Sequence, residues 1–466
     1  MSRLSFLDLA FFLTESEGSP KHVAGLSLFK KPAGASAQWV HQLAEEFSRF
    51  DTPSAPFNQV VDLRALGGPR WRTSQDFSLE DHVFYHRPEK VLSERELFDY
   101  CSSLHEPLMD RSKPMWEYHI IDRVSGSRFA IYARIHHAYA DGVTMSRWMI
   151  SSLSESARNK QLKAIWVQQE QDQRDAEEAA DSREALFERV TRSVRNWRQI
   201  IRGITKLSTQ LALEQFGLTR NAVSLPFKAT EDTPLTGDVT PGRQFATAHV
   251  PMERIKEIRR MTRCTLNHIA LTCLDGALRR YLADNEVELD RPLSIQMPVN
   301  LRDEDEKVSG NKIGIVMVDL APSDSDPYTR LREIGFTLRN VRNQIDGVPA
   351  IAVAQYTAIL AVLIELVQLL KIDRLLPAIA DTLVSNVPGP RKALYLKGAR
   401  LEQMLPISTL PPGIRLNITL YSYSGTLHFG LVATEHMENL SDLGRYIEEA
   451  FEELEEAVFD PDAAQA

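Results

Sequence analysis

The fold is decided by the stretch Arg128-Phe129-Ala130-Ile131-Tyr132-Ala133-Arg134-Ile135-His136-His137-Ala138-Tyr139-Ala140-Asp141-Gly142. Its first eight residues are rich in aromatic and β-branched side chains and predict a β-strand. The residues from Val143 to Ile150 are typical of the first turns of a helix. The two histidines therefore lie at a strand-to-helix junction, where α/β proteins often carry their functional groups.

The adjacent histidines are the leading catalytic candidates of this stretch. Histidine can take and return a proton near neutral pH. In addition, Asp141 can hold a ring or a loop in place, and Gly142 lets the backbone turn tightly. A pair of structural histidines and a metal site are the alternatives, although no third ligand with suitable spacing is evident. The pattern favours acid–base chemistry without a metal.

Strand parity separates the two histidines. Alternate side chains of a strand point to opposite faces, so His137 continues the face of Ile135, and His136 continues that of Arg134. The rings should point in different directions, and only one should act as the base. No Gly-x-Ser-x-Gly elbow, Walker loop or Rossmann glycine pattern accompanies them. The base would therefore remove a proton directly from a substrate hydroxyl or thiol.

Composition places the chain among globular proteins. Its 466 residues predict two domains, and its 43% hydrophobic and 25% charged content is ordinary for a soluble fold. The net charge of −9 argues against nucleic acid as a partner. The cysteines (Cys101, Cys264 and Cys273) show no CxxC spacing, which predicts a reducing, cytoplasmic location without disulfides or zinc. The N-terminus does not resemble a signal peptide, and polar residues interrupt the apolar run from Asp346 to Glu365.

Helices and strands mix along the whole chain, which predicts an α/β fold with α+β layers. Expected strands are 22–29, 117–122, 128–135, 244–250, 291–300, 312–320, 415–422 and 426–434, and expected helices are 37–50, 93–104, 252–263, 266–282, 327–343, most of 351–382, and 440–459. Residues Val384–Pro390 predict a tight loop. The expected parts are an N-terminal half at 1–158, a linker at 159–242 and a C-terminal half at 243–466.

The linker contains an amphipathic stretch with a basic stripe at 183–206. One interpretation is a connector between the halves whose apolar side packs on the protein. The other is attachment to an anionic membrane or lipid-droplet surface, because arginines beside Trp197 and isoleucines suit an interface. The second interpretation would add a peripheral position on the inner membrane or on lipid droplets to the cytoplasmic one.

Four further motifs, together with the histidine motif, give the chain a recognisable pattern. In order they are Pro114-Met115-Trp116, the histidine motif, Asn267-His268, Pro298-Val299-Asn300-Leu301-Arg302 followed by Gly310-Asn311, and Ser385-Asn386-Val387-Pro388-Gly389-Pro390. Over about residues 4–455 the chain resembles the bacterial wax ester synthase/acyl-CoA:diacylglycerol acyltransferase family, within the HHxxxDG acyltransferase superfamily. Met115 stands where that family has Leu, and His268 where it has Asp.

The resemblance implies two similar CoA-dependent-acyltransferase-like halves around a central tunnel, joined by a helical linker. Acyl-CoA would enter from one side and a fatty alcohol or diacylglycerol from the other, with no metal or other cofactor. His137 would be the general base, and His136 would position it or line the tunnel. Asn267 at a helix start is the first candidate oxyanion donor, with the Ser385-Asn386 segment second. Capping and loop hydrogen bonds are equal alternatives for these residues.

Asp141 should support the site rather than react, with Arg302 or Arg134 as its cation. Pro114-Met115-Trp116 should form core or tunnel wall. The leading function is an O-acyltransferase making wax esters, triacylglycerol or both. A condensation-type acyltransferase using carrier-bound acyl groups and a non-enzymatic lipid-binding protein are the alternatives. The intact histidine pair argues against the last, because binding alone needs no titrating base.

Overall fold

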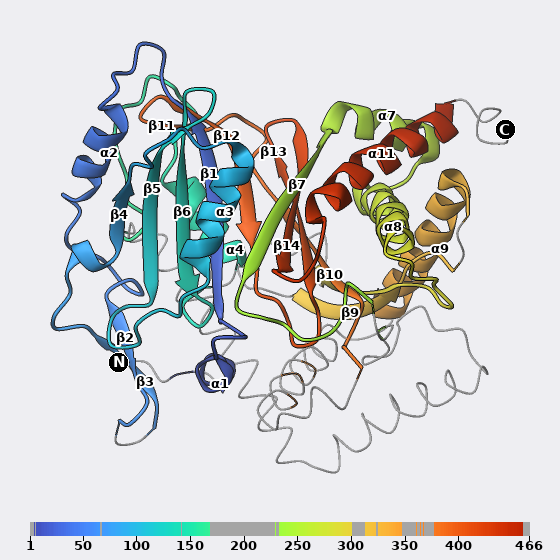
Figure 1. The fold of residues 1–466 in the computed structure, drawn as a ribbon, viewed down its shortest axis with the longest axis horizontal. Helices are drawn as coiled ribbons and strands as arrows, with labels where there is room; N and C mark the ends of the chain where they lie inside the picture. Colours follow the sequence, from blue (N-terminus) through green and yellow to red (C-terminus); the bar gives the residue numbers. More distant parts are fainter. Residues whose placement is uncertain are drawn as a thin grey trace.

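The computed structural model describes residues 4, 6–65, 68–140, 142–167, 229, 233–300, 313–322, 325–346, 360, 364, 367 and 377–459. Two six-stranded sheets stand side by side (Figure 1). The first has the order β11 (Tyr395–Leu396), β12 (Ala399–Ile407), β1 (His22–Lys30), β6 (Arg128–His136), β5 (Trp116–Val124) and β4 (Val83–His86). The second has the order β7 (Arg243–Pro251), β14 (Thr426–Thr434), β13 (Leu416–Tyr423), β10 (Thr382–Pro388), β8 (Ser294–Asn300) and β9 (Ile313–Asp319).

Both sheets mix antiparallel and parallel pairs and carry helices. The helices are α1 (Phe6–Thr14), α2 (Trp39–Phe47), α3 (Glu94–His105), α4 (Gly142–Ser151), α7 (Met252–Thr262), α8 (Leu266–Asp284), α9 (Pro327–Asp346) and α11 (Leu440–Phe459), with a short 3-10 turn at Leu79–Asp81. A hairpin of β2 (Gln59–Asp62) and β3 (Arg70–Thr73) completes the described elements. The predicted α/β fold with two halves is confirmed, whereas the central tunnel stays a prediction.

The first sheet is buried on both faces, as the alternation of β6 requires. One face packs Phe129, Ile131 and Ile135 in a cluster with α2 and α4. The other packs Ala130 and Tyr132 in a cluster with α3. Such two-sided burial explains why the strand reads as an almost continuous apolar run. At roughly 25 cal/mol per Å² of apolar surface, this burial is the main force that holds β6 in the sheet.

The second sheet packs on a helical layer that lies on one side of it (Figure 1). Helix α8 is the most buried of these helices, with Leu274 and Leu278 fully covered. It packs against α9 and α11, and α11 also packs directly on β7. Because most of α8 from His268 to Leu282 is buried, the helix cannot shift without exposing core, and its first turn is attached to a rigid element.

Residues from outside the first half complete the first sheet. Strand β12 pairs with β1 from Ala24↔Ile407 to Lys30↔Arg400. Residue Trp166, within the predicted linker, is fully buried in the first core and donates a 2.7 Å hydrogen bond to the Phe50 carbonyl. No single point in the sequence therefore separates the residues of the two sheets. Strand β12 comes from the C-terminal half but pairs within the first sheet, which connects the two halves.

Several local predictions are confirmed. Ser93 caps α3 through a capping box with Glu96. Strands β5 and β6 form the expected antiparallel pair, and its turn places Gly126 and Ser127 at positive φ (72° and 59°). The expected helix at 440–459 is α11. The amphipathic stretch at 183–206 and most of the helix expected at 351–382 lie outside the described residues.

The tight loop predicted at Val384–Pro390 is wrong. Residues Thr382–Pro388 form strand β10, which pairs in parallel with β13 and β8 inside the second sheet. The Pro-Gly-Pro ending suggested a loop, but those residues only end the strand. The amino acids before them are Thr-Leu-Val-Ser-Asn-Val, and burial between two neighbouring strands selects the extended form.

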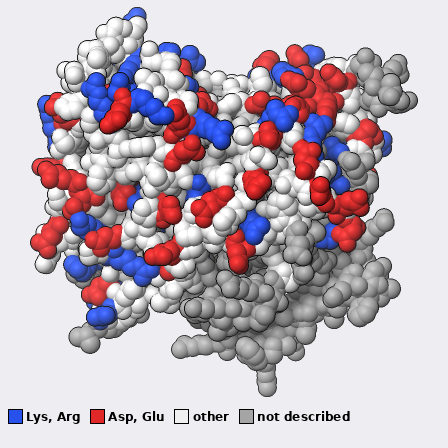
Figure 2. Space-filling view, viewed as in Figure 1, with Lys and Arg blue, Asp and Glu red and all other residues white. Residues whose placement is uncertain are grey.

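Charges of both signs are interspersed on the face shown in Figure 2, and acidic side chains gather over α11 (Figure 2). That helix carries the run Glu448-Glu449 and Glu452-Glu453 with Glu455-Glu456. Within the described residues, no helix is both long and apolar enough to cross a membrane.

Candidate active site

The two histidines lie at the C-terminal end of β6, an interior strand of the first sheet. At its end His136 pairs with His22 of β1, and its N–H donates a 2.9 Å hydrogen bond to the Met115 carbonyl. The His137 N–H donates a 2.7 Å bond to the carbonyl of Lys21. Both backbones are thus fixed by neighbouring strands, which orients the rings with little freedom.

The ring of His136 is completely buried and has a defined protonation state. Its Nδ1 accepts a 3.2 Å hydrogen bond from the Ala138 N–H, so the proton of the neutral ring is on Nε2. Nε2 lies 3.5 Å from Oε1 of Glu15. Burial, and secondly the neighbouring His137, hold the pKa of His136 well below its usual value. The ring is therefore neutral and has no nitrogen lone pair available to a substrate.

Helix α1 covers both histidine rings. The Phe12 ring stacks on His136 with centroids 4.4 Å apart, and the Phe11 ring lies 4.7 Å from His137. Two consecutive helix residues thus each contact one histidine. In contrast to its neighbour, His137 is only partly buried. The two rings have different surroundings, which agrees with their opposite strand parity.

Glu15 connects the end of α1 to the histidine pair. Its carboxylate is 1% exposed and accepts bonds from Arg111 at 2.8 and 3.2 Å and from the Lys21 N–H at 3.4 Å. The Lys21 carbonyl in turn holds the His137 N–H. One buried carboxylate therefore faces His136 and fixes the backbone that supports His137.

The loop after the histidines is held by Tyr139. Its hydroxyl donates a 2.8 Å bond to the Gln59 carbonyl and accepts one from the Met115 N–H at 3.2 Å. Gly142 is the first residue of α4, and the tight turn expected there stays a prediction because Asp141 lies outside the described residues.

The supporting carboxylate and its proposed cation, Asp141 and Arg302, lie outside the described residues. The other proposed cation, Arg134, donates a 2.8 Å bond from Nε to Glu117 and bonds from Nη1 to the carbonyls of His105 and Pro107. Its guanidinium is thus held by a different carboxylate, on the neighbouring strand β5. Trp116 and Met115, both 2% exposed, pack in the core as expected.

The structure brings the two predicted oxyanion candidates together. Asn386 on β10 donates a 2.7 Å hydrogen bond from Nδ2 to Oδ1 of Asn267 on α8. Capping does not occupy Asn267, because Thr265 is the N-cap of α8. His268 completes the capping box, and its Nδ1 accepts a 3.4 Å bond from the Thr265 N–H. The residue that departs from the family pattern therefore has a structural role at the helix start.

Ser385 points to the other face of β10 and links the two sheets. It donates a 3.0 Å bond to Thr419 on β13, whose hydroxyl lies 3.5 Å from that of Ser408. Ser408 directly follows β12, whose last residue, Ile407, pairs with Ala24 of β1. The polar residues of the second sheet thus lie a short distance from the strand that holds His136.

Apolar packing brings the same parts of the molecule together. Met145 and Trp148 of α4, just after the histidine motif, share a cluster with Tyr421 of β13 and Val387 of β10. Val387 is the residue after Asn386. The element that follows the histidine motif and the strand that carries Asn386 therefore meet where the two sheets contact each other, and the common site stays a prediction.

Sequence reasoning missed Phe11, Phe12, Glu15 and Arg111. The aromatic pair at the end of an apolar helix was the one available signal. Contact between Glu15 and His136 joins positions far apart in the chain, and periodicity does not reveal such a pair. Within the described residues, no group of three or more His, Cys, Asp or Glu side chains is arranged to hold a metal ion.

Comparisons with known families and proteins cover almost the whole chain. Residues 4–270 match the wax ester synthase/diacylglycerol acyltransferase catalytic domain, and residues 309–455 match the C-terminal domain of the same group. The chain is 30% identical over 456 residues to a probable diacylglycerol O-acyltransferase of Mycobacterium tuberculosis, covering 97% of this chain and 98% of the relative. It is also 30% identical over 463 residues to the O-acyltransferase WSD of Acinetobacter baylyi, covering 98% and 97%.

Solved structures extend the comparison. The wax ester synthase/diacylglycerol acyltransferase from Marinobacter aquaeolei matches with a TM-score of 0.74 and 26% identity, covering 98% of this chain and all of that one. The first condensation domain of the calcium-dependent antibiotic synthetase matches with a TM-score of 0.57 and 13% identity, over 98% and 96%. The second match shows a shared fold alone. The motifs, the site and these matches over nearly the full length establish that the chain belongs to the wax ester synthase/diacylglycerol acyltransferase family.

Proposed function

We propose that the protein transfers a long-chain acyl group from acyl-CoA to a fatty alcohol, a diacylglycerol or both, with His137 as general base and without an acyl-enzyme. Two relatives that are 30% identical over almost the full length are named O-acyltransferases. The observation that carries the assignment of the base is the contrast between the two histidines. His136 is completely buried and its Nδ1 accepts a bond from the protein backbone, whereas His137 is only partly buried.

The reaction requires a proton carrier and no redox partner. His137 takes the proton of the acceptor hydroxyl as its oxygen attacks the thioester carbonyl. The tetrahedral intermediate then collapses, the carbon–sulfur bond breaks, and the proton passes from His137 to the CoA thiolate. An ester and free CoA leave, and the histidine is again neutral. A positioned base of this kind contributes about 10²–10⁴-fold to the rate.

The asparagine pair supports the second requirement, which is stabilisation of the oxyanion. Because Oδ1 of Asn267 accepts from Asn386, the Nδ2 group of Asn267 is turned away from that bond and can donate elsewhere. A fixed donor of this kind contributes about 10²–10³-fold in acyl-transfer enzymes. Helix α8 is held by the second core, so the donor is supported by a rigid element.

The test uses purified protein with palmitoyl-CoA and either hexadecanol or a diacylglycerol, and measures free CoA and lipid product. We expect CoA release with at least one acceptor and its loss in His137→Ala. The matched control is His41→Ala, since His41 is an exposed histidine on α2. Absence of CoA release with both acceptors would refute the transferase, and full activity of His137→Ala would refute the assignment of the base.

The protein is also proposed to work at a lipid surface, because its products are insoluble in water. The support is the basic amphipathic stretch at 183–206, which is a property of the sequence alone. Flotation with anionic liposomes should show binding that weakens as salt is added. Binding that is insensitive to salt, or no binding, would contradict this part of the proposal.

A further inference from the structure

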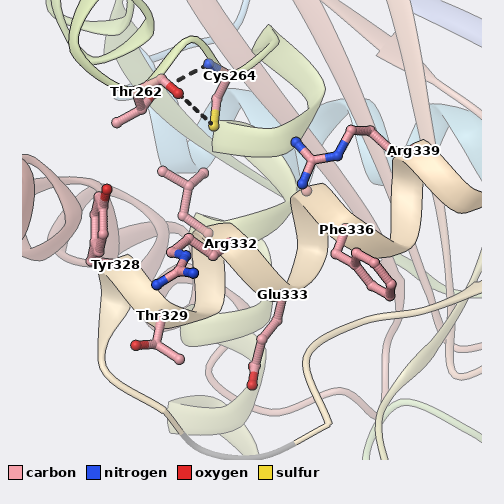
Figure 3. A pocket seen from close by; sticks show the side chains of 10 residues that line it. Thr262, Cys264, Tyr328, Thr329, Arg332, Glu333, Phe336 and Arg339 are labelled. Carbon is pink, nitrogen blue, oxygen red and sulfur yellow. Dashed lines mark hydrogen bonds between the residues drawn. The ribbon is translucent and has the colours of Figure 1, made fainter.

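A basic surface lies on the second half, next to the first turn of α8. One pocket of about 650 Å³ is formed between α9 and the connection from α7 to α8, with Arg332, Arg339 and Cys264 in its lining (Figure 3). A second, of about 320 Å³, adjoins it through Cys264 and is otherwise lined by Lys256, Arg259, Arg260 and Arg263. Their linings contain six basic residues and one acidic residue, Glu333. This is unusual in a chain whose net charge is −9.

Lys256 of this basic surface pairs with Glu253 at 2.8 Å, but most of its other cations have no carboxylate partner among the described residues. Among the described residues, no carboxylate forms an ion pair with Arg260, Arg263, Arg332 or Arg339. Arg259 uses its Nε to donate to the Cys264 carbonyl. By contrast, arginines elsewhere on the same layer are paired, as Arg254 is with Glu455. Unpaired arginines that converge on a hollow are suited to bind phosphate groups.

Glu333, the one acidic residue of the lining, does not neutralise the arginines of the basic surface. Glu333 accepts a 3.2 Å bond from the Ser325 hydroxyl near the start of α9. Figure 3 shows its side chain pointing away from the connection between α7 and α8, whereas the Arg339 guanidinium extends toward that connection (Figure 3). The Cys264 thiol and amide are both bonded to Thr262, which fixes the wall opposite α9.

The basic surface adjoins the first turn of α8, which carries the proposed oxyanion donor Asn267. Cys264 is followed by Thr265, the N-cap of α8, and Asn267 in the same turn bonds to Asn386. On the other side of this turn, His268 packs beside Gly335 of α9. One rigid helical turn thus separates the arginines from the proposed oxyanion donor. A substrate with an anionic head and a reactive group on a long arm could contact both.

We propose that this basic surface binds the phosphorylated nucleotide of the acyl-CoA donor, while the pantetheine arm passes the first turn of α8 toward His137. This rests on the proposed acyl transfer. The nucleotide carries a diphosphate and a ribose phosphate, which match a cluster of unpaired arginines. The arm carries the thioester, and its length is needed because the arginines lie outside the reaction site.

The experiment compares two donors with the same acyl chain, dodecanoyl-CoA and dodecanoyl-pantetheine, with hexadecanol as acceptor. In the double variant Arg332→Gln/Arg339→Gln, we expect KM for dodecanoyl-CoA to rise at least about tenfold, because the loss of even one charge-assisted contact costs about 1.4 kcal/mol. KM for dodecanoyl-pantetheine should not change, because this donor has no phosphate. Adenosine bisphosphate should inhibit the wild type competitively and the variant weakly. The matched control is Arg95→Gln, an exposed arginine of α3.

Three results would overturn this inference, and they differ from failure of the transferase itself. An equal change of KM for both donors would show a general effect on the site. An unchanged KM for dodecanoyl-CoA would show that the arginines do not bind the donor. Loss of binding to phosphatidylglycerol vesicles in the variant, with donor KM unchanged, would show that the surface contacts lipid. If the transferase assignment fails, the wild type transfers from neither donor.

Discussion

Asn386 of β10 and Asn267 of α8 form a 2.7 Å hydrogen bond, Nδ2 to Oδ1, that joins a strand and a helix of the second half. Both side chains are partly buried. The bond orients the amide of Asn267, so the two residues should act as a unit. Because Ser385 alternates with Asn386 on β10, one short strand both orients this amide and bonds to Thr419 on β13.

Substitution of Asn267 and substitution of Asn386 should both lower kcat, but by different factors. Asn267→Ala should lose about 10²-fold if its amide stabilises the oxyanion. Asn386→Ala should lose about tenfold, equivalent to about 1.4 kcal/mol, because it acts by orienting the other amide. The double variant should resemble Asn267→Ala, since coupled residues are not additive. Steady-state kinetics will test this, with exposed Asn159→Ala as control; multiplicative losses would contradict it.

Substitution of the two histidines should separate chemistry from stability. His137→Ala should reduce kcat by about 10²–10⁴-fold with little change in unfolding. His136→Ala should instead cost about 2–4 kcal/mol of unfolding free energy, because a buried ring stacked on Phe12 is lost. Urea denaturation and kinetics of both variants will distinguish these effects. Equal destabilisation of the two would contradict the different roles.

Glu15→Gln should weaken the support of the histidine pair. The buried carboxylate bonds to Arg111 and the Lys21 N–H and faces His136, so loss of its charge should cost about 1–3 kcal/mol. Arg111 is 43% exposed and can be solvated, which limits the cost. We expect a lower Tm and a lower kcat, since Lys21 holds the His137 N–H. Glu17→Gln, at an exposed neighbouring position, is the control; identical behaviour of the two variants would exclude a positioning role.

Stability should fall as the solution is acidified below the pKa of an unfolded histidine. Burial, and secondly Arg134, lower the pKa of His22 from 6.5 to about 3. Between these two pKa values, His22 is protonated in the unfolded chain and neutral in the folded protein. The free energy of unfolding therefore falls by about 1.4 kcal/mol for each pH unit of acidification. The loss begins near pH 6.5 and ends near the folded pKa of about 3.

Glu117 adds to this loss at lower pH. Burial alone would raise its pKa, but hydrogen bonds from His119 and Arg134 lower it from 4.5 to about 2. Its contribution is present above pH 4.5 and is lost as the pH falls toward 2. Denaturation at about pH 7.5 and about pH 5 isolates the histidine effect, and His22→Gln should reduce the difference by about 2 kcal/mol. Exposed His41→Gln should leave the difference unchanged.

The sequence by itself determined the strand and helix types around the motifs, the capping of α3 and the family. These depend on local periodicity, on turn residues and on short motifs, which are readable along one chain. The sequence also predicted that the rings of His136 and His137 point in opposite directions, because the alternation of side chains along a strand is a local property. It misjudged Val384–Pro390, since burial between β13 and β8 overrides local loop signals.

Only the tertiary structure decided which distant residues meet. Crossing of β12 into the first sheet, contact of Phe11 and Phe12 with the histidines, and the bond between Asn267 and Asn386 each join segments far apart in sequence. Such pairs arise from packing and from the need to satisfy buried polar groups, and neither is encoded in a local pattern. The sequence therefore indicates the chemistry, whereas packing selects the partners that position it.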